Sequence, residues 1–298
     1  MPRAVKRTPY KHPDYHHLRA VVVVVCIVLI GLWWWASHPS TTKTFWDSMD
    51  NNLATASVTK HDVQSQQGDT TNQYTQMEFG VMNASHALST VTQQGNTVTS
   101  ETIGSPRNDY SRYVSIKTTQ KSLGGQNIKS DKFLGIWGKS PDAPANVPAS
   151  VQYFQQSVLG IVPFGNFTAQ QRHDLIKLMQ DNKTYSLGPV ENSKLNGRGV
   201  YIYAVNINPQ SLIELLQQYA KDLGLGNIGL DPSQYAGSPP IRTQFTIDKL
   251  SRNLVKVHYS ADSQDETYSS QGLEQPITLP VKAIPIDQLQ NKVVQSLK

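Results

Sequence analysis

The sequence predicts an α+β domain with an antiparallel sheet, placed outside the membrane and preceded by a single transmembrane helix. Three observations carry this prediction. An uncharged apolar run covers residues 20–36. Five short segments rich in Val, Thr, Ile and Tyr follow in close succession, separated by Gly, Asn and Asp, as expected of a β-meander. Several segments with the apolar periodicity of helices then interrupt and close the strand pattern.

The first element is the run Ala20–Ala36, within "RAVVVVVCIVLIGLWWWASHP". As a helix it would span about 25 Å, close to the ~30 Å of hydrocarbon in a bilayer. A cleaved export signal usually has a shorter run followed by small residues, but here three tryptophans stand at positions 33–35. A lipidated cysteine requires a small residue before it, whereas Cys26 follows Val25. A permanent anchor is therefore favoured over a cleaved signal and over a lipoprotein signal.

Basic residues predict the orientation of this anchor. Residues 1–19 carry five Lys/Arg and one acid, a net charge of +4, which leaves 22 Lys/Arg against 21 Asp/Glu in residues 20–298. Positive charge stays on the cytoplasmic side. We therefore expect a cell-membrane protein with a cytoplasmic basic tail (1–19), a transmembrane helix (20–36), a juxtamembrane linker (37–43) and an extracytoplasmic domain (44–298). Because the tail accounts for most of the basicity, no nucleic-acid partner is expected.

The outer domain opens with a helix and a meander. Thr44 to Asp47 reads as a capping-box-like helix start, and apolar residues then share one helical face as far as Ala56. Gln93–Asn96 is a hairpin-turn pattern, with Gly95 supplying a positive φ. The expected strands are Val58–Gln64, Tyr74–Val81, Ser85–Gln93, Thr97–Ile103 and Tyr110–Thr118, with a further short strand at Phe133–Trp137.

A proline-rich linker, Ser140–Pro148, separates the meander from a second half that mixes helices and strands. Thr168 with Gln171 forms a capping box, and Asn208 followed by Pro209 starts another helix. The expected elements are helices at 151–158, 168–180 and 209–223, strands at 200–205, 243–248, 254–260 and 265–269, and a closing helix at 287–297.

The stretch "RTQFTIDKLSRNLVKVHYS", a polar strand and "EQPITLPVKAIPIDQL" together resemble the C-terminal half of the LolA/LppX/LprG-like lipoprotein and lipid-carrier superfamily. The resemblance extends over Phe45–Leu297 and is clearest over Val200–Leu289. It implies a strongly curved antiparallel half-barrel with helices on its concave face, where family members hold acyl chains. This chain keeps an anchor where the carriers have a cleaved signal or a lipidated cysteine. That difference favours holding, presenting or sensing a ligand at one membrane over shuttling between two.

The candidate ligand-binding residues are apolar and cluster around the inserted helices. They either form an ordinary core beneath the sheet or the wall of an apolar cavity, and the two interpretations overlap because a cavity wall is also core. The set is Phe154, Leu159, Ile161, Val162, Phe164, Phe167, Leu175, Met179, Leu212 and Leu216.

Two functions follow from this set. The first is a membrane-anchored binding protein that holds an apolar or lipid ligand. The alternative is a structural or regulatory, sensor-like component of a cell-envelope protein complex, which contacts its partner through the helix 209–223 or a sheet edge. A filled concave face with no cavity, together with an exposed apolar patch, would favour the alternative.

No enzyme, cofactor or metal site is expected. The sequence has no Gly-x-Ser-x-Gly, P-loop, His-Glu-x-x-His or calcium-loop motif. Gly224–Gly229 contains Gly-x-Gly-x-x-Gly, but it follows a helix, so a helix C-cap and loop is the better interpretation. A cluster of two or more acids or histidines in one pocket would reopen the enzyme hypothesis. Asn83, Asn166 and Asn182 stand in Asn-x-Ser/Thr triplets, which matter only in a cell that glycosylates exported proteins.

Overall fold

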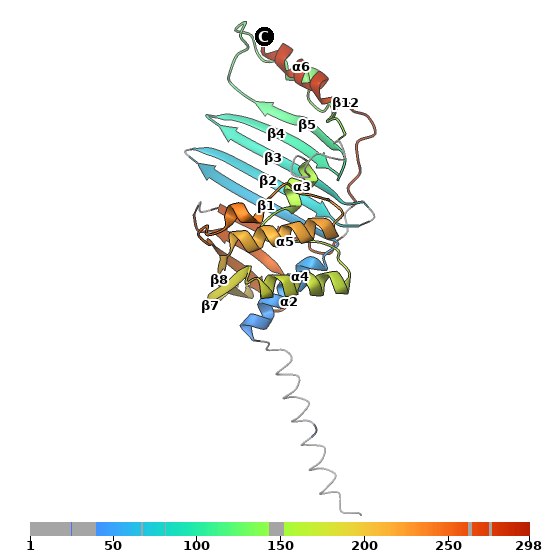
Figure 1. The fold of residues 1–298 in the computed structure, drawn as a ribbon. Helices are drawn as coiled ribbons and strands as arrows, with labels where there is room; N and C mark the ends of the chain where they lie inside the picture. The colour runs from blue at the N-terminus through green and yellow to red at the C-terminus, as the bar shows by residue number, and fades with distance from the viewer. Residues whose placement is uncertain are drawn as a thin grey trace, which may run out of the picture. The chain divides into compact units, whose positions relative to one another are not determined.

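The computed structural model describes residues 25, 40–66, 68–80, 82–142, 152–261, 264–273 and 276–298 (Figure 1). The predicted tail and, apart from residue 25, the predicted transmembrane run lie outside the described residues, whereas residues 41–43 of the predicted linker already belong to helix α2 (Thr41–Leu53). The chain divides into two compact units, Met1–Lys43 and Thr44–Lys298, and the second carries the fold described below. Over the described part of the chain, the helices are too short or too polar for a bilayer crossing.

The domain is built on one sheet of twelve strands, in the order β12-β6-β5-β4-β3-β2-β1-β11-β10-β9-β8-β7. The sheet is mostly antiparallel and is not closed into a barrel. Its strands are β1 (Ser57–Gln66), β2 (Asp69–Glu78), β3 (Ala84–Gln93), β4 (Asn96–Gly104), β5 (Asp109–Lys117), β6 (Gly138–Lys139), β7 (Tyr185–Leu195), β8 (Arg198–Ile207), β9 (Ile241–Asp248), β10 (Leu254–Tyr259), β11 (Gln264–Ser269) and β12 (Ile284–Pro285).

Two antiparallel meanders make up most of this sheet. Strands β1 to β5 form the first and β7 to β11 the second, and each strand pairs with its neighbour in sequence. The two meanders meet where β1 pairs antiparallel with β11, with Lys60 opposite Tyr268 and Asp62 opposite Glu266. The short pair β12–β6 is parallel. The first and nearly the last strands of the sequence thus lie side by side near the middle of the sheet.

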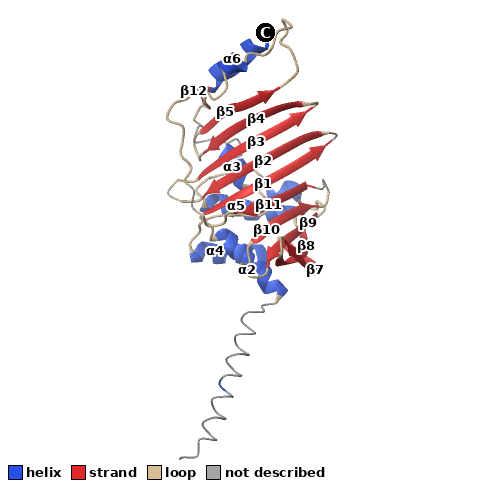
Figure 2. Ribbon diagram, turned by 180° about the vertical axis from the view of Figure 1, so that it is seen from behind, coloured by secondary structure: helices blue, strands red, loops and turns tan. Residues whose placement is uncertain are grey.

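Five α-helices and two short 3₁₀ helices accompany the sheet among the described residues. Helices α3, α4 and α5 lie on one face, here called the helix-covered face, whereas Figure 2 shows the opposite face largely free of helices. Helix α6 lies beside β6 and β12 at one end of the sheet. Their bounds are α2 (Thr41–Leu53), α3 (Tyr153–Val158), α4 (Ala169–Asp181), α5 (Pro209–Asp222), α6 (Ile286–Leu297), η1 (Ser130–Lys132) and η3 (Pro232–Tyr235).

The turns and helix starts follow local chemistry. Thr168 and Gln171 form a complete capping box at the start of α4. The Asn208 side chain accepts a hydrogen bond from the Ser211 amide at the start of α5. In the β3–β4 hairpin Gln94 and Gly95 both have positive φ, at 48° and 77°, as a two-residue hairpin turn requires. The predicted strand at Phe133–Trp137 is wrong, because that segment is a turn between η1 and the two-residue strand β6.

The main hydrophobic core lies between the sheet and α2 to α5. Phe45 of α2 packs against Tyr203 of β8 and Phe245 of β9, with ring centroids 5.5 Å and 6.0 Å apart. A second, smaller core forms where residues 277–279 and Trp137 pack on Ala84, Ile103 and Tyr110. The described elements are therefore those of an α+β domain, as predicted from the sequence.

Candidate functional site

The ten predicted ligand-binding residues come together in one layer between the helices and the sheet. Eight are buried members of the main core, and Leu159 and Ile161 are half-buried and pack against it. Phe164 lies 5.0 Å from the ring of Tyr268 on β11, and Phe167 lies 5.6 Å from the ring of Tyr219 on α5. The set therefore joins α3, α4, α5 and the loop 159–167 to the sheet.

The loop 159–167 is fastened from several sides. The Tyr219 hydroxyl donates to the carbonyl oxygen of Phe164 at 2.6 Å, and the Tyr185 hydroxyl donates to that of Ile161 at 2.7 Å. The amides of Gly165 and Phe167 donate to carbonyls of α2, those of Asn52 and Leu53, at 3.0 Å each. Burial raises the pKa values of both tyrosines, so their hydroxyls stay protonated and remain donors. A loop of this sequence, rich in glycine, is thereby held in one conformation.

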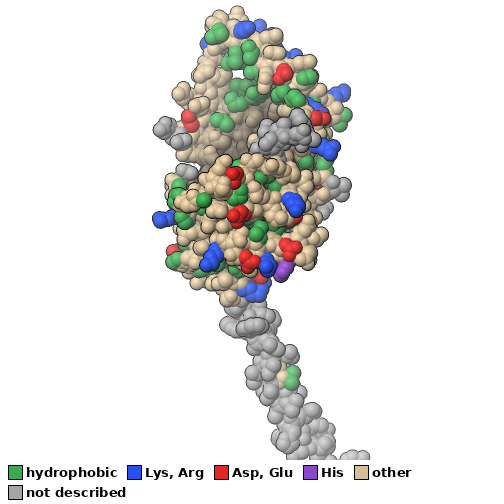
Figure 3. Space-filling model, viewed as in Figure 1, with side chains coloured by type: hydrophobic (Ala, Val, Ile, Leu, Met, Phe, Trp, Pro, Cys, Tyr) green, Lys and Arg blue, Asp and Glu red, His purple; other side chains and the backbone are tan. Residues whose placement is uncertain are grey.

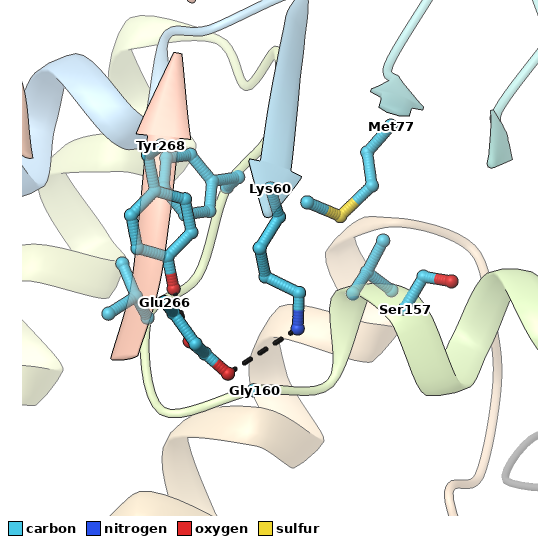
Figure 4. A pocket seen from close by; sticks show the side chains of 9 residues that line it. Lys60, Met77, Ser157, Gly160, Glu266 and Tyr268 are labelled. Carbon is cyan, nitrogen blue, oxygen red and sulfur yellow. Dashed lines mark hydrogen bonds and ion pairs between the residues drawn. The ribbon is translucent and has the colours of Figure 1, made fainter. Parts of the chain in front are cut away.

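A small cavity remains at the edge of this layer, between α3, the start of the loop and strands β1, β2 and β11 (Figure 4). Its volume is about 20 Å³, which is room for about one water molecule. Its wall is apolar on one side, through Met77, Val162 and Phe164, and charged on the other, through Lys60 and Glu266. Among the described residues, this cavity therefore has space for a water molecule rather than for an acyl chain.

The charged wall belongs to a buried ionic cluster. Lys60 Nζ lies 3.1 Å from Asp62 Oδ2 and 3.4 Å from Glu266 Oε1, and the Tyr268 hydroxyl donates to Glu266 Oε2 at 2.6 Å. Asp62 is only 8 % exposed, and its second carboxylate oxygen has no hydrogen-bond partner among the described residues. One ammonium group thus balances two carboxylates at the junction of the two meanders.

The environment of this cluster shifts the pKa values of Asp62, Lys60 and Tyr268. Burial raises the pKa of Asp62, and the positive charge of Lys60 only partly offsets this effect. Burial acts to lower the pKa of Lys60, but the charges of Glu266 and Asp62 outweigh it and the pKa rises. Burial and the adjacent Glu266 also hold the pKa of Tyr268 well above its usual range. Lys60 therefore stays charged and Tyr268 stays protonated.

These charged residues were not predicted as a site. Lys60 and Asp62 lie on β1, whereas Glu266 and Tyr268 lie on β11, about 200 positions away. The sequence does contain one signal, since Val58, Lys60 and Asp62 alternate along a strand and so share the face of the apolar Val58. Only the register of β1 against β11 reveals that the partners are Glu266 and Tyr268.

The cluster places two acids, Asp62 and Glu266, around one lysine, but only Glu266 lines the cavity, so the condition that would reopen an enzyme interpretation is not met there. The adjoining cavity also has room for about one water and not for a substrate. Among the described residues, no group of three His, Cys, Asp or Glu side chains is placed to hold a metal ion. The arrangement can fasten the two meanders together through charge and hydrogen bonds, and it can hold a water molecule.

Beyond α3, the helix-covered face of β2 to β5 is open and polar. Figure 3 shows this part of the face hollowed above the helix layer. The β-register places Gln73, Ser89, Ser100 and Tyr113 in one row across these strands. Gln73 Nε2 donates to the Tyr153 hydroxyl of α3 at 3.3 Å, which fixes the row on the helix-covered face. The face thus changes from apolar and packed to polar and open at α3.

Comparisons with known proteins add nothing to this geometry: no family model and no curated protein matches the chain.

Proposed function

We propose that the chain is a single-pass membrane protein of the cell envelope whose extracytoplasmic domain acts as a structural or regulatory component. The observation that carries this proposal is the filled helix layer. A site for a drug-sized or acyl ligand usually encloses about 300–1,000 Å³. The cavity beside Phe164 encloses about 20 Å³. A helix layer packed in this way leaves the surfaces of the domain, including the open polar face beyond α3, for recognition.

The proposed architecture is that of the lipoprotein and lipid-carrier superfamily, a curved half-barrel with helices on its concave face. Two features support this architecture. The two meanders are joined through β1 and β11, and helices inserted between β5 and β9 lie on one face of the sheet. In this chain the part of that face under α3 to α5 is packed as core, whereas the part over β2 to β5 beyond α3 is open and polar. The membrane anchor rests on the sequence, through the uncharged run of residues 20–36 and the five basic residues before it.

Binding of an apolar ligand is the second candidate function. What favours it is that all ten predicted residues meet in one apolar layer, with the small cavity at its edge. Mechanistically, displacement of α3 and the loop 159–167 would open this layer to an acyl chain. Each buried CH₂ would contribute about 0.8 kcal/mol.

Native mass spectrometry of purified residues 40–298 separates the two candidates. This segment is suitable because the whole main core lies within residues 44–298. For a structural component we expect the bare mass of the chain, and no rise in melting temperature on adding fatty acids or phospholipids. A co-purified lipid whose loss lowers the melting temperature would establish the carrier function instead.

A variant sharpens this test. Val162→Ala with Phe164→Ala removes side chains from the cavity wall. If the layer is only core, the variant loses about 4–6 kcal/mol of stability and its bound mass does not change. If the layer holds lipid, the variant changes which acyl-chain lengths co-purify.

A further inference from the structure

The end of the domain that carries α6 is strongly basic. Residues 117–139 contain five lysines and one acid, a net charge of +4, and residues 276–298 contain three lysines and one acid, a net charge of +2. Residues 44–298 contain 21 basic and 21 acidic residues. The remainder of the domain therefore carries −6, and the charge of the domain is separated between two regions.

The fold brings the two basic segments into contact. The amides of Leu123 and Gly124 donate to the carbonyl oxygens of Leu297 and Lys298 at 2.9 Å and 3.1 Å. Helix α6 also packs against η1 and β6. The exposed Lys129 and Lys132 of the first segment thus lie on one surface with Lys298 of the second.

A cleft of about 240 Å³ opens between this loop and the last turn of α6. Lys129, Lys132 and Lys298 line it, together with the hydroxyl-bearing Ser122 and Ser296. No aspartate or glutamate is among its described lining residues, and none of these lysines has an ion-pair partner in the described part of the chain. The Ser296 hydroxyl already donates to the Lys292 carbonyl oxygen, so the available donors are the ammonium groups and the Ser122 hydroxyl. Such donors without a balancing aspartate or glutamate are the chemistry of an anion site, such as one for a phosphate group.

Exposed apolar side chains stand among these lysines. Leu123 is 91 % exposed at the tip of its loop, and Val294 and Leu297 of α6 are 48 % and 42 % exposed. Figure 3 shows hydrophobic and basic side chains together at this end of the domain. Basic residues that surround projecting apolar side chains are typical of surfaces that bind anionic lipid headgroups while inserting into the interface. The surface at this end of the domain consists of Leu123, Lys129, Lys132, Val294, Leu297 and Lys298.

This surface lies at the far end of the sheet from the start of the domain. The chain enters through α2, which packs on β8 and β9, whereas the surface adjoins β6. β6 and β8 are nine strand positions apart in the sheet, roughly 40 Å along it at ~4.8 Å per strand. The end that follows the predicted anchor and the basic end can therefore contact different membranes.

From the charge separation, the cleft and the exposed leucines, we propose that the α6 end of the domain binds the anionic headgroups of a lipid bilayer. Because residues 20–36 would hold the chain in its own membrane, the domain then bridges two bilayer surfaces. This second step rests on the proposed function, since it requires the membrane anchor. The first step, binding of anionic lipid, does not.

The test uses the full chain, with its anchor placed in nanodiscs of phosphatidylcholine. These nanodiscs are mixed with liposomes of phosphatidylcholine alone or of phosphatidylcholine with phosphatidylglycerol, and co-flotation is measured. We expect flotation with the anionic liposomes only, weakening as salt is raised. Equal flotation with both kinds of liposome, or with neither, would overturn the proposal.

Variants separate this surface from general electrostatic attraction. Lys129→Gln with Lys132→Gln should weaken binding about 25-fold, at about fivefold per lysine. Leu123→Ser should weaken it without changing the salt dependence. Lys194→Gln with Lys221→Gln removes the same charge outside this surface and should leave binding unchanged. If both double variants weaken binding equally, the assigned surface is wrong.

Two further arms identify the source of the anion and the role of the anchor. If inorganic phosphate at low concentration displaces the liposomes, the cleft is a site for a free ion and the lipid proposal fails. If the chain does not enter nanodiscs, the anchor and the proposed function fail. The soluble chain is then floated directly with the same liposomes, so that the lipid-binding step is still decided.

Discussion

The Tyr219 hydroxyl is the best single probe of how the loop 159–167 is held. Tyr219 is fully buried, and its hydroxyl donates to the Phe164 carbonyl oxygen at 2.6 Å. The described residues offer that carbonyl no other donor. Tyr219→Phe therefore deletes one oxygen atom and leaves a buried acceptor without a partner.

The expected cost follows from this geometry. A typical hydrogen bond contributes a net ~0.5–1.5 kcal/mol, but an acceptor left buried and unpaired costs about 1–3 kcal/mol. The Phe ring preserves the packing of Tyr219 against Phe167, so no cavity term is added. We expect the free energy of unfolding to fall by about 2 kcal/mol, a drop in melting temperature of roughly 4–8 °C for a domain of this size.

Urea denaturation of residues 40–298 measures this loss. Tyr74→Phe is the matched control, because it removes the same atom from a side chain that is 48 % exposed and leaves its ring stacked on His61. The control should lie within about 0.5 kcal/mol of the wild type. If Tyr219→Phe falls in that range too, the hydroxyl does not fasten the loop and the reasoning is wrong.

Two further predictions concern buried charges. Lys60→Met leaves Asp62 and Glu266 without their cation and should cost about 2–3 kcal/mol at neutral pH, discounted for the partial exposure of Lys60. Urea midpoints should show the variant recovering as the pH is lowered, because the pKa of Asp62 is already raised and its protonation removes the repulsion. In the wild type the pKa of Lys60 is raised above 10.5, so the stability that Lys60 contributes should be present below that pH and be lost above it. If the variant loses as much stability as the wild type when the pH is raised above 10.5, this reasoning is contradicted. At the turn between β9 and β10, burial acts to raise the pKa of Asp248, but hydrogen bonds from the turn and the charge of Arg198 outweigh it and the pKa falls below 3.8. The stability that Asp248 contributes is therefore present above pH 3.8 and lost as the pH falls. Asp248→Asn should cost about 1 kcal/mol at neutral pH and progressively less as the pH is lowered below 3.8, which urea midpoints measured at neutral and at acidic pH would show.

Most elements of the fold could be predicted from the sequence because their signals are local. The β-branched segments between turns became β1 to β5, and the capping patterns at Thr168 and Asn208 start α4 and α5. Strand β7 was missed because it contains Gly188 and Pro189 at a register shift and is mostly polar and exposed. An edge strand of this kind lacks the alternation that marks a half-buried strand.

The candidate site was only half predictable. Apolar periodicity identified the members of the set on α3, α4 and α5, because each lies on a buried face of its helix, and the apolar composition of the stretch 159–167 identified the rest. Whether they enclose a ligand depends on how the loop 159–167 fills the space, which no local pattern encodes. The partner of Lys60 on β11, Glu266, could not be predicted from the sequence, because it depends on the pairing of β1 with β11.

That pairing also has a consequence for how the chain folds. Within each meander the strands pair with neighbours in sequence, so each can form from local contacts at a low cost in loop-closure entropy. The seam between β1 and β11 instead joins residues about 200 positions apart, which makes it the late and slow step. A chain that emerges N-terminus first must keep the edge of β1 unpaired until residues 264–269 arrive. During synthesis that edge is an open template for aggregation, and a chaperone that caps β1 would act in this interval.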